Sequence, residues 1–237
     1  AIPIVEGNII QADPPLLQVL AFREGLWYNK KTFDFRLCGG SMKNTKEKIL
    51  QTALTLFARD GYEAVSVSAI AGELGITKGA LYRHYDSKRA IFQAILARME
   101  QEDAVRAEQF DLPTGTLAEM EEHYRRACFS QLEAFCRAQF QYWTEDPFAS
   151  AFRRMLTLEQ YRSPEMSALY QQYLGAGPLG YVRDLFTAWG LPQAVEKALA
   201  LYGTMFLLYA VYDGAQEKES AAALLEKSLR RMEAWFR

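Results

Sequence analysis

Residues 66–91 encode two short helical segments joined by a tight turn, and this spacing restricts the possible folds more than any other feature of the chain. Ser66 and Thr77 stand where the two segments begin, and both hydroxyls can cap a helix. Gly75 between them tolerates the backbone dihedral that a tight turn requires. The pattern predicts a helix-turn-helix unit, whose second helix lies in the major groove of DNA.

Small and cationic residues occupy the start of the second segment. Lys78 can donate to guanine O6 and N7, and Gly79 lets the backbone approach the groove at a cost of about 1 kcal/mol of helix propensity. The alternative for Gly79 is neutral drift, without any role in DNA contact. The alternative for Ser66 and Ser68 is helix capping without a phosphate contact. The predicted DNA contacts are Ser66, Ser68, Thr77, Lys78, Gly79, Tyr82, Arg83, His84 and Lys88, with the serines and Lys88 assigned to phosphates.

The charge distribution agrees with a DNA-reading module on an acidic body. Residues 42–91 hold eight Lys or Arg and five Asp or Glu, a net charge of +3. The whole chain has a net charge of −2, so the remainder carries −5. Net charge alone argues against a bulk nucleic-acid binder, whereas a basic module favours local binding.

Helical spacing of apolar residues flanks this unit on both sides. A first helix is expected from Thr45, as its cap, to Gly61, which ends it, and a long helix from Lys88, after the cap Ser87, to about Gln109. The second segment of the unit is expected to reach about Tyr85. Ala71 and Gly72 are read as small residues that let the two short helices cross closely.

The remainder of the chain shows no strand pattern. Helical segments are expected at 115–144, 148–161, 164–188, 193–213 and 219–236, with an interruption at 175–178. The predicted fold is therefore all-α, with about nine helices: an N-terminal three-helix helix-turn-helix domain at 42–91 and a larger helical effector-binding and dimerisation domain at 92–237. Residues 1–41 read as an extension foreign to these domains, and a native arm is the alternative.

Residues 45–95 closely resemble the tetracycline-repressor (TetR) family of bacterial regulators. The matching run extends from Ile70-Ala71 through Leu74-Gly75-Ile76-Thr77-Lys78-Gly79-Ala80-Leu81-Tyr82 to Tyr85 and Ser87-Lys88, and the preceding helix matches at Ala53, Phe57 and Gly61-Tyr62. Tyr85 stands where the family usually has Phe. The resemblance implies a homodimer that represses transcription from an inverted-repeat operator and is released by a small-molecule effector.

The segment 193–213 is apolar nearly all round after Lys197, which is typical of a helix buried on all sides. Burial inside one subunit is possible, but 179–189 and 193–213 resemble the family's two dimer helices. The expected dimer anchors are Leu185, Trp189, Tyr202, Phe206 and Tyr209.

The region 123–174 is unusually aromatic, so some of its residues are expected to line a pocket for an apolar or aromatic effector. Ordinary core packing is the alternative for each residue taken singly. The candidates are Met99, His123, Phe140, Trp143, Phe152, Met155, Glu159 and Tyr170, among which His123 and Glu159 could orient a ligand.

Other functions leave weaker traces in the sequence. Two histidines, no phosphate-binding glycine loop and no HExxH predict no enzyme, no cofactor and no metal site. Three cysteines without CxxC spacing indicate reduced thiols in the cytoplasm, and no apolar run reaches the roughly 18 residues that a membrane span needs. The alternatives are a helical ligand-binding or scaffold protein whose DNA module is inactive, and an all-α enzyme.

Overall fold

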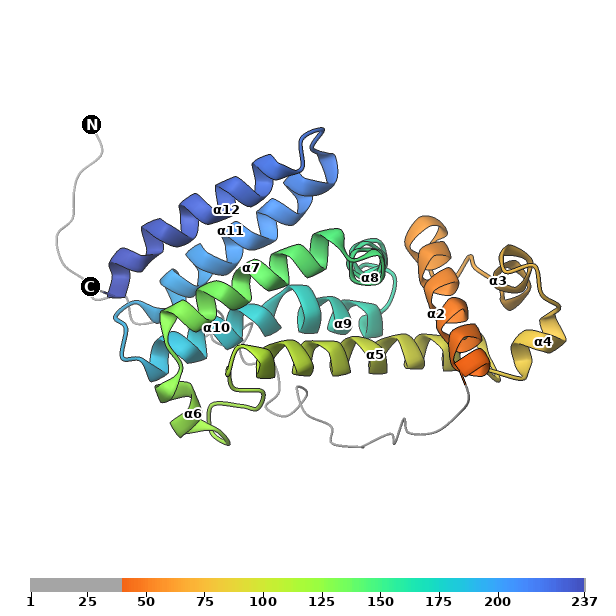
Figure 1. Ribbon diagram of the computed structural model, residues 1–237, viewed down its shortest axis with the longest axis horizontal. Coiled ribbons are helices and arrows are strands. Elements are labelled where there is room, and N and C mark those ends of the chain that lie inside the picture. Colours follow the sequence, from red (N-terminus) through yellow and green to blue (C-terminus); the bar gives the residue numbers. More distant parts are fainter. Residues whose placement is uncertain (1–39, 237) are drawn as a thin grey trace.

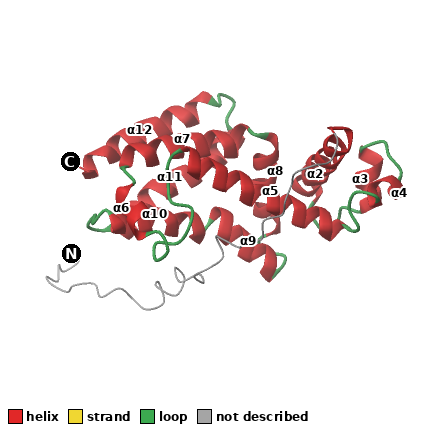
Figure 2. Ribbon diagram, turned by 60° about the horizontal axis from the view of Figure 1, so that its bottom comes forward, coloured by secondary structure: helices red, strands yellow, loops and turns green. Residues whose placement is uncertain are grey.

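The computed structural model describes residues 40–236, and every regular element in this range is a helix (Figures 1 and 2). The predicted extension at 1–41 lies almost entirely outside the described residues. The elements are α2 (Gly40–Asp60), α3 (Val67–Glu73), α4 (Lys78–Tyr82), α5 (Lys88–Gln109), α6 (Glu121–Arg126), α7 (Phe129–Glu145), α8 (Pro147–Glu159), α9 (Pro164–Leu174), α10 (Ala176–Ala188), α11 (Ala194–Gly214), α12 (Glu219–Met232) and the 3-10 helix η1 (Glu233–Phe236).

The described range holds more helices than the nine expected, because two predicted segments divide. The segment 115–144 breaks between α6 and α7, where Ala127 and Cys128 are extended. The segment 164–188 breaks at Gly175, as expected, and yields α9 and α10.

The first domain is built on α2, whose apolar stripe is buried as the spacing predicts. Ile49, Leu54 and Phe57 are fully buried, and α2 packs against α8, α5 and α3. The helix ends at Gly61, which has φ +91 and donates to the Phe57 carbonyl at 3.0 Å. Thr45 lies inside α2 and does not cap it, since no helix-breaking residue separates it from the start at Gly40.

Helix α5 belongs to both parts of the molecule, and the predicted boundary at 91/92 falls inside it. Phe92 packs its ring 4.9 Å from that of Tyr62 in the first domain. Met99, two turns later, is fully buried in the body. Figure 1 shows α5 running from the α2–α4 end of the molecule along the body. A displacement of α5 therefore reaches both parts.

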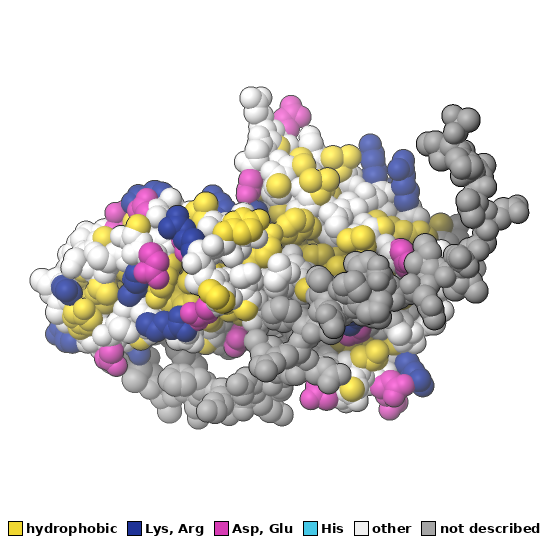
Figure 3. Space-filling view, turned by 180° about the vertical axis from the view of Figure 1, so that it is seen from behind, with side chains coloured by type: hydrophobic (Ala, Val, Ile, Leu, Met, Phe, Trp, Pro, Cys, Tyr) yellow, Lys and Arg dark blue, Asp and Glu magenta, His cyan; other side chains and the backbone are white. Residues whose placement is uncertain are grey.

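In the body, α11 packs against α10, α12 and α7, and α8 contacts both α7 and α2. Helix α11 is not buried on all sides within the subunit. Leu199, Phe206, Leu207 and Val211 on one side of it are 57%, 41%, 63% and 41% exposed. On the face of the molecule drawn in Figure 3, hydrophobic side chains gather over the helical body.

The length and composition of α11 would also allow it to cross a membrane, with 33% of its most apolar window buried. Its uninterrupted apolar stretch is shorter than the helix, because Lys197 precedes that stretch and Asp213 ends it. The packing of α11 against three helices accounts for its apolar character without a bilayer.

Candidate nucleic-acid interface and effector region

The turn between α3 and α4 is fixed by backbone hydrogen bonds at a positive-φ glycine. Gly75 has φ +65 and donates to the Gly72 carbonyl at 3.0 Å, while Ile76 donates to the Ala71 carbonyl at 3.0 Å. This pair of bonds is a Schellman motif, in which a left-handed residue ends the helix and turns the chain. The turn predicted from Gly75 is therefore confirmed.

Both expected caps form. The Ser66 hydroxyl oxygen accepts from the Ala69 N–H, and the Thr77 hydroxyl oxygen accepts from the Ala80 N–H, each at 3.1 Å. A capping hydroxyl uses one lone pair and keeps its own proton. Capping and donation to a phosphate are thus compatible for Ser66 and Thr77.

Helix α4 has 5 residues and ends at Tyr82, three residues before the expected end. Leu81 is fully buried, and Tyr85 beyond the helix is half-buried, where burial raises the pKa of its hydroxyl to about 12. The other side of α4 faces solvent. Of the predicted DNA contacts, Ser66, Ser68, Thr77, Lys78, Gly79, Tyr82 and Arg83 are exposed and His84 is half-buried.

Charged side chains are present on the end of the molecule that carries α3 and α4 (Figure 3). The Lys78 ammonium lies 5.6 Å from the centre of the Tyr82 ring, a weak cation–π contact that leaves its protons available. Lys78 and Tyr82 can therefore present one donor-rich surface to DNA.

Lys88 does something other than the predicted free phosphate contact. Its ammonium donates to the carbonyl oxygens of Tyr62 and Glu63 at 2.8 and 3.3 Å and lies 4.4 Å from the centre of the Tyr62 ring. The side chain is 23% exposed. Lys88 thus ties the start of α5 to the α2–α3 loop, a long-range contact that its position after the cap Ser87 could not reveal.

The two small residues of α3 have different roles. Ala71 is buried in the core, as expected. A Cβ on Gly72 would meet nothing within 4 Å, so Gly72 does not serve a close helix crossing and that reading is wrong.

A substitution at Gly79 separates the effect on stability from the effect on DNA affinity. A Cβ at this position would meet nothing within 4 Å in the free protein. We therefore expect Gly79→Ala to leave the free energy of unfolding unchanged or to raise it by up to about 1 kcal/mol. We expect its affinity for operator DNA to fall, because the methyl group would enter the space between helix and groove. Chemical denaturation and fluorescence anisotropy test the two effects, and unchanged DNA affinity would assign Gly79 to drift.

Glu159 joins the body to the first domain and is not near the other proposed ligand-orienting residue. It is 1% exposed, accepts from the Tyr62 N–H at 3.0 Å and pairs with Arg162 at 3.5 Å. A Cβ on Gly61 would lie 2.8 Å from its carboxylate. The predicted role of Glu159 in orienting a ligand is therefore replaced by a contact between α8 and the end of α2.

His123 lies on α6, at the opposite end of the body from α2 (Figure 1). Its Nε2 is 3.2 Å from the Asp111 carbonyl oxygen and 3.3 Å from the Asp111 carboxylate. His123 and Glu159 consequently do not share a site.

Two ion pairs add to the connection between the domains. Arg89 of α5 makes a two-pronged contact with Glu165 of α9, which lowers the pKa of that carboxyl group. Arg98 of α5 pairs with Glu47 of α2, and its guanidinium lies 3.8 Å from the centre of the Phe148 ring. Helices α5 and α8 therefore connect the helical body to the first, DNA-reading domain.

The remaining effector candidates meet in the body core. Met99, Phe140, Trp143, Phe152 and Met155 are buried, and Tyr170 is half-buried. The rings of Trp143 and Phe152 lie 6.3 Å apart, and Phe140 stacks at 5.6 Å on Tyr209. Core packing explains each contact, and a ligand-lining role for this set stays a prediction.

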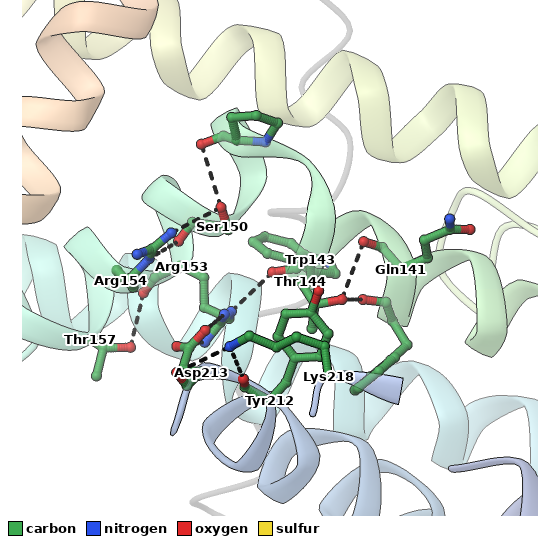
Figure 4. Close-up of polar contacts among 12 residues, drawn as sticks. Gln141, Trp143, Thr144, Ser150, Arg153, Arg154, Thr157, Tyr212, Asp213 and Lys218 are labelled. Carbon is green, nitrogen blue, oxygen red and sulfur yellow. Dashed lines mark hydrogen bonds and ion pairs between the residues drawn. The ribbon is translucent and has the colours of Figure 1, made fainter. Parts of the chain in front are cut away.

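An ion pair with a buried arginine, which the sequence did not single out, holds α8 against α11 (Figure 4). Arg153 is 6% exposed, and its two terminal nitrogens donate to the two Asp213 carboxylate oxygens at 2.9 Å each. Its Nε donates to the Trp143 carbonyl at 3.2 Å, and Lys218 binds the carbonyl of Tyr212 beside it. The sequence feature that could have indicated this ion pair is Asp213, an acidic residue near the end of a long apolar helix.

Three of the five expected dimer anchors are enclosed by their own subunit. Leu185, Tyr202 and Tyr209 are 0%, 9% and 4% exposed, and the Tyr202 hydroxyl donates to the Leu174 carbonyl at 2.7 Å. Their side chains are not available to a second copy, so these assignments are wrong. Trp189 is half-buried and donates to the Tyr124 carbonyl at 2.9 Å. Phe206 is 41% exposed and remains available.

The capped, solvent-facing α4 held by a Schellman turn is the arrangement of a DNA-reading helix. A family model described as bacterial regulatory proteins, tetR family, matches residues 49–95, which contain this unit. Residues 49–95 of the chain are therefore a TetR-family DNA-binding segment. Within residues 40–236, no group of three His, Cys, Asp or Glu side chains is placed to hold a metal ion.

Several relatives of this chain are described as transcriptional regulators. The chain is 46% identical over 50 residues to the uncharacterized HTH-type transcriptional regulator YerO of Bacillus subtilis. The matched segment covers 21% of this chain and 17% of YerO. The chain is also 33% identical over 87 residues to the transposon Tn10 TetC protein of Escherichia coli. This match covers 35% of the chain and 44% of TetC. The matched segments thus span less than half the length of these relatives.

Solved structures extend the likeness to the whole fold. The complex of SmeT with triclosan superposes with a TM-score of 0.57 at 17% identity, covering 79% of this chain and 91% of SmeT. A transcriptional regulator from Aquifex aeolicus VF5 superposes with a TM-score of 0.54 at 19% identity, covering 79% of this chain and 99% of that regulator. At such identities the likeness establishes the all-α fold of this chain and nothing finer.

Proposed function

We propose that this chain is a DNA-binding transcriptional regulator, a repressor that leaves an inverted-repeat operator when a small apolar or aromatic effector binds its body. One observation carries the proposal: Thr77, Lys78, Gly79, Tyr82 and Arg83 gather on the exposed side of α4, whose other side is anchored by Leu81. Hydrogen-bond donors on a short helix that begins with small residues can contact base edges and phosphates.

A homodimer supplies the second reader. Leu199, Phe206, Leu207 and Val211 form an exposed apolar face on α11, which we call the α11 face. Contiguous exposed apolar residues commonly mark an interface between proteins. A two-fold pairing through the α11 face would place two copies of α4 on one side of B-DNA, where successive major grooves lie roughly 34–36 Å apart.

The effector would act by changing that separation. Met155 and Phe152 in the aromatic core lie on α8, the helix whose last residue, Glu159, contacts Tyr62 of the reader domain. Movement of α8 would thus shift the reader. SmeT, described as the repressor of the Stenotrophomonas maltophilia multidrug efflux pump SmeDEF, has the same fold and is known in complex with triclosan. We place the regulator in the cytoplasm, where operator DNA is found.

The variants Lys78→Ala and Arg83→Ala test the reader directly. We expect each to lose about 1–3 kcal/mol of discrimination at the base pair it contacts, because a side-chain donor to a base edge is removed. Fluorescence anisotropy with operator duplexes substituted at single positions measures this loss. Lys227→Ala, an exposed lysine on α12, is the matched control and should behave as wild type. Base preference that survives in both reader variants would contradict these assignments.

A further inference from the structure

Tyr85 carries a hydroxyl group that the packing of the subunit does not use. Its half-buried ring packs against the core, and its N–H donates to the Leu81 carbonyl at 3.2 Å, so the chain makes one more turn beyond α4. Within residues 40–236 the hydroxyl makes no hydrogen bond, and it is not among the buried polar atoms that lack a partner. A phenylalanine ring would fill the same space, so the hydroxyl is available to a group outside the subunit.

Lys46 brings a positive charge to the same place from another helix. Its ammonium lies 5.9 Å from the centre of the Tyr85 ring, within the range of a weak cation–π contact. Lys46 stands one helical turn before Ile49 and Leu50, which are buried, so the spacing turns its side chain toward the rest of the DNA-reading domain. Figure 1 shows the start of α2 at the end of the molecule that carries α4.

The charge of Lys46 is not neutralised in the free protein. Its acidic neighbour in the chain, Glu47, pairs with Arg98 of α5. Lys46 itself is exposed and makes no ion pair with any other residue in the described range. An ammonium group and a phenol hydroxyl that share one ring and keep their protons available are both common donors to phosphate oxygens.

We propose that Lys46 and the Tyr85 hydroxyl together bind one phosphate of the operator backbone, beside the surface of α4 that reads bases. This inference rests on the proposed function and adds two DNA contacts to it. A phosphate contact fixes the orientation of the reader on the duplex and carries no sequence information. Because burial raises the pKa of Tyr85 to about 12, the hydroxyl stays protonated and remains a donor at neutral pH.

Tyr85→Phe removes the hydroxyl and keeps the ring. We expect operator affinity to fall by about tenfold, the size of a lost hydrogen bond to a charged group, and to fall equally on operators substituted at single base pairs. The thermal midpoint should be unchanged or higher, because the hydroxyl has no partner within the described residues. Tyr161→Phe, at a tyrosine that is 90% exposed after α8, is the control for fluorescence anisotropy. Wild-type affinity of Tyr85→Phe, or a loss that depends on the base pair, would overturn the proposal.

Lys46→Gln tests the charge. The slope of log affinity against log salt concentration should become shallower by about one for each reader bound, because one phosphate fewer is neutralised. Lys46→Arg keeps the charge and should retain the wild-type slope. Lys48→Gln makes the same change at an exposed lysine on another side of α2 and is the control. Equal slopes for Lys46→Gln and Lys48→Gln would overturn the proposal.

The outcome is separable from that of the proposed function. Wild-type DNA binding by both Tyr85→Phe and Lys46→Gln would overturn this inference and leave the regulator intact. A wild-type chain that binds no duplex would overturn the regulator, and this inference with it.

Discussion

We expect the substitution Leu207→Glu to turn the dimer into a monomer and to weaken binding to an inverted repeat by about 100-fold or more. Leu207 is 63% exposed at the centre of the α11 face, so a charge there leaves the subunit core intact but would be buried unpaired between two copies. Two linked readers gain affinity because the second binds as if at millimolar concentration. A monomer loses that gain.

Sedimentation equilibrium measures the mass and anisotropy measures the affinity. Leu158→Glu introduces the same charge at another exposed leucine, 48% exposed on α8 and outside the α11 face, and should remain dimeric. Circular dichroism should show equal helix content in both variants. A Leu207→Glu protein that stays dimeric would place the interface elsewhere.

We expect Asp213→Ala to lower the free energy of unfolding by roughly 2–3 kcal/mol, between the values for exposed and fully buried ion pairs. Arg153 is 7% exposed in its side chain and Asp213 is 36% exposed, so removal of the carboxylate leaves a nearly buried guanidinium without its two-pronged partner. Urea denaturation measures the change. The effect should be larger than that of cutting a surface pair.

The double variant Arg153→Met, Asp213→Ala separates the lost attraction from the stranded charge. We expect it to recover most of the stability, since an apolar side chain of similar length needs no partner. Asp60→Ala, which breaks the exposed pair of Asp60 with Arg59, is the control and should lower stability far less than Asp213→Ala does. A double variant as unstable as Asp213→Ala alone would show that the stranded charge is not the cause.

The features that the sequence predicted correctly depend on neighbours in the chain. Ser66, Thr77 and Ser87 cap helices by bonding to an N–H three residues onward, and Gly75 turns the chain through its own φ. Such contacts are fixed by residue type and spacing. The all-α fold and the exposed side of α4 followed from the same local rules.

The features that the sequence missed depend on residues far apart in the chain. Lys88 bonds to carbonyls 25 and 26 residues away, and Glu159 bonds to an N–H 97 residues away. An ionisable residue in an amphipathic helix reads as solvated until its partner is placed by tertiary packing. In the same way, spacing alone marked Tyr202 and Tyr209 as apolar but could not tell whether the subunit's own core or a second copy covers them.

Unbiased selection from a random duplex pool at low ionic strength tests the central claim most directly. The account predicts enrichment of an inverted repeat whose half-site centres lie about one helical turn apart, bound by two copies, with affinity that falls steeply as salt rises. The Gly79→Ala and Lys78→Ala chains should enrich it less. A wild-type chain that enriches no sequence, or that binds a single unrepeated site as a monomer, would contradict the account.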